Sequence, residues 1–163
     1  MDRQPKSQLG AASHRPLCLG QVATFDGRDD VFLECASARI RLGPLWTPWL
    51  TLAVLRIGHE DHPFNALARA PLSRVRLKDL TWSFETANAH KRLSVRFESR
   101  REHVVGLRYR NPPGGERICL NSKLARVNVS LERRGQDPLH FQSTHGGAFE
   151  VLGEDDLGVP MAN

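Results

Sequence analysis

The sequence predicts an all-β protein, an antiparallel meander of about eight to ten strands that closes into a β-barrel. Short runs alternate apolar and polar residues and follow one another at intervals of about ten residues. Gly, Pro, Asn or Asp residues separate these runs. Only 65–70, NALARA, has the composition of a helical turn. Closure into a barrel would remove the exposed edges of so long a meander.

The predicted strands follow one another in a simple order. The first half of the chain contains strands at 17–25, 31–42, 48–57, 72–77 and 80–86, and the third of them precedes the polar turn GHEDHP. The second half contains strands at 92–99, 103–110, 119–136, 138–144 and 147–153. Within 119–136, Val127, Val129 and Leu131 alternate with polar residues, which predicts a strand with one buried face.

A short polar segment, CLNSK at 119–123, opens this strand where hydrocarbon is expected. Asn121 and Ser122 have short side chains that hydrogen-bond to nearby backbone groups. The segment therefore predicts a corner, with Leu120 ending one strand and Leu124 beginning the next. Ser122 and Lys123 are adjacent, and adjacent side chains diverge in an extended chain, which argues against a catalytic Ser–Lys pair.

With 163 residues, the chain is most simply one domain. We expect a flexible lead-in at 1–16, the barrel at 17–153 and an acidic, loose tail at 154–163. No apolar run approaches the roughly 20 residues of a membrane-spanning helix, so no membrane span is predicted. The N-terminus lacks a hydrophobic secretory signal, and three widely spaced cysteines fit buried thiols, which favours the cytoplasm.

The formal net charge of +5 raises the question of nucleic-acid binding. Arginines are spread over most predicted strands, and only four lysines occur. Proteins that bind single strands place aromatic side chains among the basic ones. Here the aromatic residues fall mostly on the strand faces opposite Arg92, Arg96, Arg108 and Arg110, so the pattern favours a solvated surface.

The common catalytic motifs are missing from the sequence. It contains no phosphate-binding loop, no dinucleotide fingerprint, no nucleophile elbow and no HExxH helix, and we predict no cofactor. The nearest metal pattern is His59 and His62 in GHEDHP. No third ligand is fixed by spacing, so a solvated turn is favoured over a metal site.

Several rows of apolar residues are predicted to point into the barrel. They comprise Trp82 and Phe84; Leu93, Val95 and Phe97; and His103, Val105, Leu107 and Tyr109. Such rows either fill the core or line a cavity for one hydrophobic ligand. Under the second interpretation Trp82, Phe84, Phe97, Val105 and Tyr109 contact the ligand.

Glu34 shares a strand face with Phe32, Ala36 and Ala38. If that face is interior, Glu34 is a carboxyl in apolar surroundings, as a general acid requires, and it joins the ligand-contacting residues. Alternatively Glu34 pairs with an arginine, or the face is the outer one at this point, because one bulge reverses the parity of a strand.

Five segments, in this order, carry a family resemblance. They are LCLGQVATFDG with Gln21 and Phe25, LTWSFET with Trp82, EHVVGLRY with His103 to Val105, CLNSKLARVNVSLE, and GGAFEVLG with Glu150. Over 17–153 the sequence resembles the C-terminal half of the tocopherol cyclase-like family. That family lies within a lipocalin-like group that includes carotenoid hydratase-type proteins.

The resemblance implies a lipocalin-like β-barrel that binds a hydrophobic, isoprenoid or quinol-like molecule. It also implies a second barrel domain or a homodimer, because full-length relatives have two barrels. Tocopherol cyclases close a ring by protonating a prenyl double bond, and Glu150 or His103 is the candidate proton-handling group here, with Trp82 as a packing wall.

The chain also departs from the family. It is too short for the N-terminal barrel, Leu17 to Leu19 stand where a Trp-rich strand is expected, and no family acid corresponds to Glu34. The sequence leaves open whether a bound molecule is turned over, by a cyclase, lyase or hydratase reaction. The alternatives are a non-catalytic scaffold and a basic nucleic-acid-binding β-protein.

Overall fold

The computed structural model describes residues 17–110, 115–153 and 155–162, and the predicted lead-in at 1–16 lies outside this range. Its first six strands are β1 (Leu17–Val22), β2 (Val31–Ala38), β3 (Arg41–Leu42), β4 (Leu45–Trp46), β5 (Leu50–Ile57) and β6 (Glu60–Phe64). The next four are β7 (Arg74–Lys78), β8 (Thr81–Ala87), β9 (Lys91–Glu98) and β10 (Val105–Arg110). The last three are β11 (Glu116–Arg133), β12 (Gln136–Gly153) and β13 (Met161–Ala162). Two 3-10 turns, η1 (Ala70–Leu72) and η2 (Arg101–His103), precede β7 and β10.

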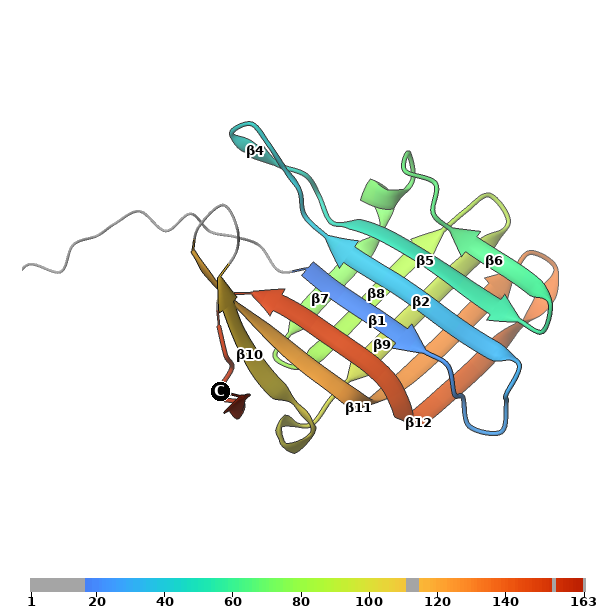
Figure 1. Ribbon diagram of the computed structural model, residues 1–163. Helices are drawn as coiled ribbons and strands as arrows, with labels where there is room; N and C mark the ends of the chain where they lie inside the picture. Colours follow the sequence, from blue (N-terminus) through green and yellow to red (C-terminus); the bar gives the residue numbers. More distant parts are fainter. Residues whose placement is uncertain (1–16, 111–114, 154, 163) are drawn as a thin grey trace, which may run out of the picture.

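Nine of these strands form one antiparallel ladder in the order β6-β5-β2-β1-β12-β11-β9-β8-β7. β10 pairs with the first half of β11, and β9 pairs with its second half. The ladder folds over on itself, so that β1, β2, β5 and β6 cross in front of β7, β8 and β9 in Figure 1. The prediction of an antiparallel all-β protein is confirmed.

The two ends of the ladder are β6 and β7. Among the described residues no backbone ladder joins these two strands. Side chains approach across this gap instead, because Lys91 at the start of β9 donates a hydrogen bond to Glu60 of β6 (3.2 Å). Closure into a barrel therefore stays a prediction.

The hairpin of β11 and β12 bends where the two layers meet. The β11–β12 register shifts between Ser122 and Ala125, and Ser122 Oγ accepts hydrogen bonds from the Leu124 N–H (3.2 Å) and from Ser99 Oγ (2.9 Å). The predicted corner is thus a bulge inside one continuous strand, and the expected break after Leu120 is wrong. The predicted strands 138–144 and 147–153 are likewise one strand, which bends at Gly147, where Ala125 and Val127 leave no room for a side chain.

Aromatic rings fill the space between the layers. Trp82 of β8 stacks on Phe97 of β9 with centroids 5.2 Å apart, and both rings lie within 6.2 Å of Phe149 from β12. A Cβ atom on Gly20 of β1 would lie 2.5 Å from the Phe97 ring and 2.9 Å from the Trp82 ring. The two layers can approach this closely because β1 has no side chain at that point.

The C-terminal segment is ordered against the sheet over 155–162, so the predicted loose tail is wrong there. Val159 is buried, the Gly106 N–H donates to the Pro160 carbonyl (2.8 Å), and β13 adds to β10 in parallel. The Arg101 guanidinium also donates to the Leu157 carbonyl. In the part of the chain that the structure describes, no helix has the length and hydropathy to cross a bilayer.

Candidate functional site

The predicted interior residues Trp82, Phe84 and Phe97 do lie in the interior. Trp82 and Phe97 have no exposed surface, and the Trp82 and Phe84 rings are 5.2 Å apart. These rings contact one another, so this part of the interior is filled by the protein itself. The Trp82 Nε1–H is buried and has no hydrogen-bond partner among the described residues. A ligand role for these three residues stays a prediction.

The residues predicted to point inward from 103–110 lie elsewhere. Val105 and Tyr109 face outward from β10, whereas Val104 and Gly106 are buried. Apart from Gly106, which the C-terminal segment covers, β10 is exposed on both faces, so this strand has no interior face along most of its length. His103 lies in η2 and lines a small surface hollow of about 170 Å³ beside Leu124.

The structure brings Glu34 and Glu150 to one place on the outer face of the sheet. Both line a hollow of about 420 Å³, named here the outer hollow, on the outward faces of β1, β2, β5 and β12. Glu34 is exposed, so the expectation of an interior carboxyl is wrong and its alternative, an outer face, is confirmed. The other outward side chains of the hollow are Leu19, Gln21, Ala36, Leu52, Val54, Asn65, Lys123 and Ala148.

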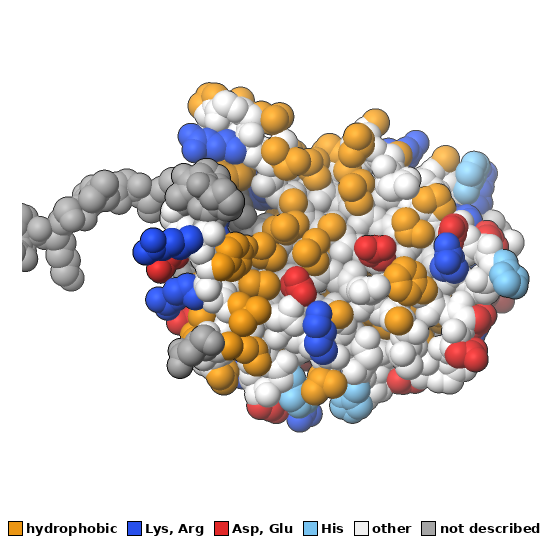
Figure 2. Space-filling view, in the orientation of Figure 1, with side chains coloured by type: hydrophobic (Ala, Val, Ile, Leu, Met, Phe, Trp, Pro, Cys, Tyr) orange, Lys and Arg blue, Asp and Glu red, His pale blue; other side chains and the backbone are white. Residues whose placement is uncertain are grey.

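Strand register sets the floor of the outer hollow. One cross-strand row runs Glu150, Leu19, Ala36 and Leu52, and the next runs Ala148, Gln21, Glu34 and Val54. Each row therefore places aliphatic side chains beside one carboxylate. Figure 2 shows apolar side chains spread over this face, with single acidic and basic groups among them.

Glu150 is held in place by two donors. The Asn121 amide donates to Glu150 Oε1 at 2.5 Å, and the Lys123 ammonium donates to the same oxygen at 3.3 Å. Both contacts use Glu150 as an acceptor. Across the hollow, Glu34 has no ion pair within the described residues. The hollow thus combines an anchored carboxylate, a second carboxylate without an ion pair to any described residue, and an apolar floor.

The cysteines supply no reactive thiolate to this site. Cys35 lies beneath the floor, is buried, and donates its S–H to the Gly20 carbonyl (3.5 Å). Burial raises the pKa of Cys35 well above its ordinary value and raises the pKa of Cys18 to about 12. Both thiols stay protonated at neutral pH, and the expectation of buried free thiols is confirmed for Cys18 and Cys35, whereas Cys119 is partly exposed.

A larger and more polar hollow, of about 710 Å³, lies on the outer face of the other layer. Its floor carries Ser83, Ser94 and Ser130, and Arg74 and Arg76 project beside it from the end strand β7. Charged side chains on an end strand guard it against pairing with other chains. The aromatic rings Phe84 and Phe141 are buried beneath this face, so the stacking groups needed for single-strand binding are not on its surface.

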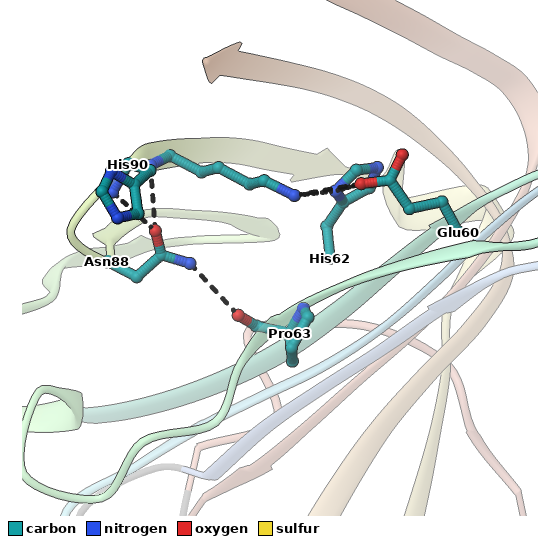
Figure 3. A network of polar contacts seen from close by, with 6 residues as sticks. Glu60, His62, Pro63, Asn88 and His90 are labelled. Atoms are coloured by element: carbon teal, nitrogen blue, oxygen red, sulfur yellow. Dashed lines mark hydrogen bonds and ion pairs between the residues drawn. The ribbon is translucent and has the colours of Figure 1, made fainter. Parts of the chain in front are cut away.

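A second polar cluster joins β6 to the β8–β9 turn. Lys91 donates to Nδ1 of the buried His62 (2.6 Å), and the Asn88 amide donates to the Pro63 carbonyl (3.4 Å), as Figure 3 shows. The prediction that GHEDHP is a solvated turn is wrong for His62, which belongs to a strand and points inward. The Lys91 ammonium group occupies Nδ1 of His62, and no metal-binding group of three ligands occurs among the described residues.

This cluster makes stability depend on pH. Burial and the Lys91 ammonium lower the pKa of His62 below its ordinary value of 6.5, so the unfolded chain binds a proton more readily than the folded one. We expect the free energy of unfolding to fall as the pH drops through 6.5 towards the folded-state pKa. Urea unfolding of wild type and His62→Gln on both sides of pH 6.5 measures this, with the substitution reducing the pH dependence.

His90→Gln is the matched control, because His90 lies in the same turn region but is exposed. It is expected to retain the pH dependence of the wild type. An equal pH dependence in the His62→Gln variant would contradict the assignment.

Sequence reasoning missed most of the outer hollow. Leu52, Val54 and Leu19 face outward, in positions where a strand with one buried face carries polar residues. One signal was present in the sequence: 50–55, LTLAVL, has almost no polar residue on either face of the strand. Nothing in the sequence indicated that Lys123 and Asn65 line the outer hollow, because each lies in a segment of the chain separate from those of the other lining residues.

Comparisons with known proteins show a similarity of fold and nothing further. No family model matches the sequence, and no curated protein matches it. A crystal structure of a putative AttH from Nitrosomonas europaea is similar, with a TM-score of 0.51 and 10% sequence identity over 88% of this chain and 52% of that one. The chain thus spans about half the length of that structure.

Proposed function

We propose that this protein binds a hydrophobic molecule with a polar head, of the isoprenoid or quinol kind, in the outer hollow. The observation that supports this is the aliphatic floor of Leu19, Ala36 and Leu52 beside the carboxylates of Glu34 and Glu150. Ligand sites are mostly apolar with a few placed polar groups, and about 420 Å³ lies in their usual range. The hydroxyls of a quinol would donate to the carboxylates while its tail covers the floor.

The proposal keeps the lipocalin-like barrel and the resemblance to tocopherol cyclases as its framework but changes the position of the ligand. Trp82 and Phe97 stack on each other in the interior, whereas the outer hollow is open to a ligand. Binding is favoured over turnover, since both contacts to Glu150 use it as an acceptor and ring closure needs a proton donor. A second barrel or a homodimer remains part of the proposal.

Equilibrium binding of geranylhydroquinone tests this function. We expect Leu52→Asp to lower the affinity at least about ten-fold, because it puts a charge into the apolar floor. Glu34→Gln keeps the shape of the side chain and a neutral acceptor oxygen, and it is expected to cost a few-fold, about the difference between a charge-assisted and a neutral hydrogen bond.

Leu124→Asp is the control, since Leu124 is exposed on β11 outside the outer hollow. It is expected to bind like wild type. Unchanged binding by Leu52→Asp together with weakened binding by Trp82→Phe would move the ligand to the interior and reject the outer hollow.

A further inference from the structure

Four leucines are far more exposed than the other large apolar side chains of the described residues. Leu42 is 65% and Leu45 72% exposed, and Leu67 and Leu72 are 75% and 76% exposed. The remaining exposed leucines and valines lie on strand faces and are half-exposed or less. These four belong to two projections, the β3–β4 hairpin at 39–47 and the loop at 65–73, which we name the two tips.

Both tips project from the same edge of the molecule. In Figure 1 the β3–β4 hairpin stands clear of the sheet, and the loop before β7 rises on the same side. Figure 2 shows hydrophobic side chains at the ends of both projections. An apolar group at a projecting tip has no neighbouring side chain to cover it.

The hairpin holds its leucines outward by its own hydrogen bonds. The Thr47 N–H donates to the Ile40 carbonyl, the Ile40 N–H donates to Thr47 Oγ1, and Arg39 Nε donates to the Thr47 carbonyl, each at 2.9 Å. Gly43, with a φ of +60°, takes the first central position of the two-residue turn between Leu42 and Leu45.

The second tip is structured as well. The Arg69 N–H donates to the Ala66 carbonyl and the Leu72 N–H to the Arg69 carbonyl, both at 2.9 Å. Ala70 is buried and anchors the turn to the sheet. The exposure of Leu67 and Leu72 is therefore a property of an ordered loop.

The charge at the tips has one sign. The sequence contains no acidic residue between Glu34 and Glu60, nor at 62–78, so both tips are free of carboxylates. Arg39 and Arg41 precede Leu42 in the hairpin, and Arg69 lies in the loop. The partly exposed Trp46 closes the β3–β4 pair, and tryptophan suits the boundary between water and hydrocarbon.

We infer that the two tips attach the protein to the surface of an anionic lipid bilayer. The leucines would enter the boundary between head groups and acyl chains, and the arginines would contact the anionic head groups. Two separate convex tips fit a broad, deformable apolar layer better than a single groove on a protein partner. This attachment lies at the surface and does not cross the bilayer.

The attachment has a consequence that rests on the proposed function. The hairpin connects the end of β2 with the start of β5, and these strands carry Ala36 and Leu52 of the outer hollow. A hydrophobic ligand dissolved in the bilayer would therefore have a short apolar path from the tips to its site.

Vesicle sedimentation of the full chain tests the inference. Vesicles of phosphatidylcholine alone are compared with vesicles containing about 30% phosphatidylserine, at low and at physiological salt. We expect sedimentation with the anionic vesicles, weakened by salt. Leu42→Asp/Leu45→Asp is expected to reduce the partition coefficient at least about ten-fold, because it removes two apolar anchors. Arg41→Gln/Arg69→Gln leaves the Arg39 contact to Thr47 in place and is expected to reduce only the preference for anionic vesicles.

Leu124→Asp is again the control and is expected to sediment like wild type. Circular dichroism and thermal unfolding verify that each variant is folded. No sedimentation of the wild type, as a protein partner would predict, overturns the inference, and so does equal sedimentation of the Leu42→Asp/Leu45→Asp variant. Geranylhydroquinone binding without vesicles should survive the tip substitutions, so failure of lipid attachment and failure of ligand binding are distinguishable.

Discussion

Phe97→Ala is expected to lower the free energy of unfolding by about 3–5 kcal/mol. The Phe97 ring is fully buried, stacks on Trp82 and lies 6.0 Å from Phe149. Its removal leaves a cavity between two sheet layers that are held apart by strand pairing and cannot simply collapse. Urea unfolding at neutral pH measures the loss.

Tyr109→Ala is the control, because Tyr109 is an aromatic residue on the outer face of β10. Its expected cost is below about 1 kcal/mol. A similarly small cost for Phe97→Ala would mean that the interior is loosely packed and open to a ligand. That result would contradict the packed interior and favour the interior rows as the binding site.

Gly20→Val is expected to destabilise the protein by about 1–3 kcal/mol or more. Its Cβ would lie 2.5 Å from the Phe97 ring, and the second methyl group adds to the overlap. Gly153→Val provides the comparison, because a Cβ at Gly153 meets no atom of the described residues within 4 Å and its φ is not positive. We expect that variant to unfold with nearly the free energy of wild type.

The double variant Gly20→Val/Phe97→Ala checks the cause. If the valine and the Phe97 ring compete for the same space, the double variant is expected to lose less stability than the two single variants lose together. The expected difference in the free energy of unfolding is about 0.5–3 kcal/mol. Simple additivity would contradict direct contact between β1 and the aromatic rings. The measurement is the same urea unfolding series applied to all four proteins.

The lipid inference and the ligand proposal meet on one side of the molecule. The outer hollow lies on the face of β1, β2, β5 and β12, and the hairpin tip continues β2 and β5. The opposite layer carries hydroxyl and guanidinium groups on its outer face. The two outer faces therefore differ in chemistry, although both are built from strands of one sheet.

Several features could be read directly from residue order. Alternation at 127–131 indicated a strand with one buried face, and Val127, Val129 and Leu131 are buried. Trp82, Phe84 and Phe97 were placed inside because each shares its strand face with apolar neighbours. The CLNSK segment was expected to interrupt a ladder, and the register shift after Ser122 shows that interruption.

Which face of a strand is buried, and whether two short runs form one strand, were harder to predict. Val105 and Tyr109 were expected inside, but β10 is exposed on both faces except at Gly106, because only the short C-terminal segment packs beside it. Residues 138–153 read as two strands with a turn at the adjacent glycines. They form one bent strand, because Gly147 has to pass close to Val127 across the bend.

The sequence by itself determined the antiparallel β architecture, the aromatic interior and the burial of Cys18 and Cys35, because strand alternation and apolar burial are local properties of neighbouring residues. Only the tertiary structure decided that Glu34 and Glu150 share one surface hollow. They lie on β2 and β12, far apart in the chain, and the pairing of β1 with both strands brings them together. The projection of Leu42 and Leu67 was also beyond the sequence, since the exposure of a leucine depends on what the rest of the fold places beside it.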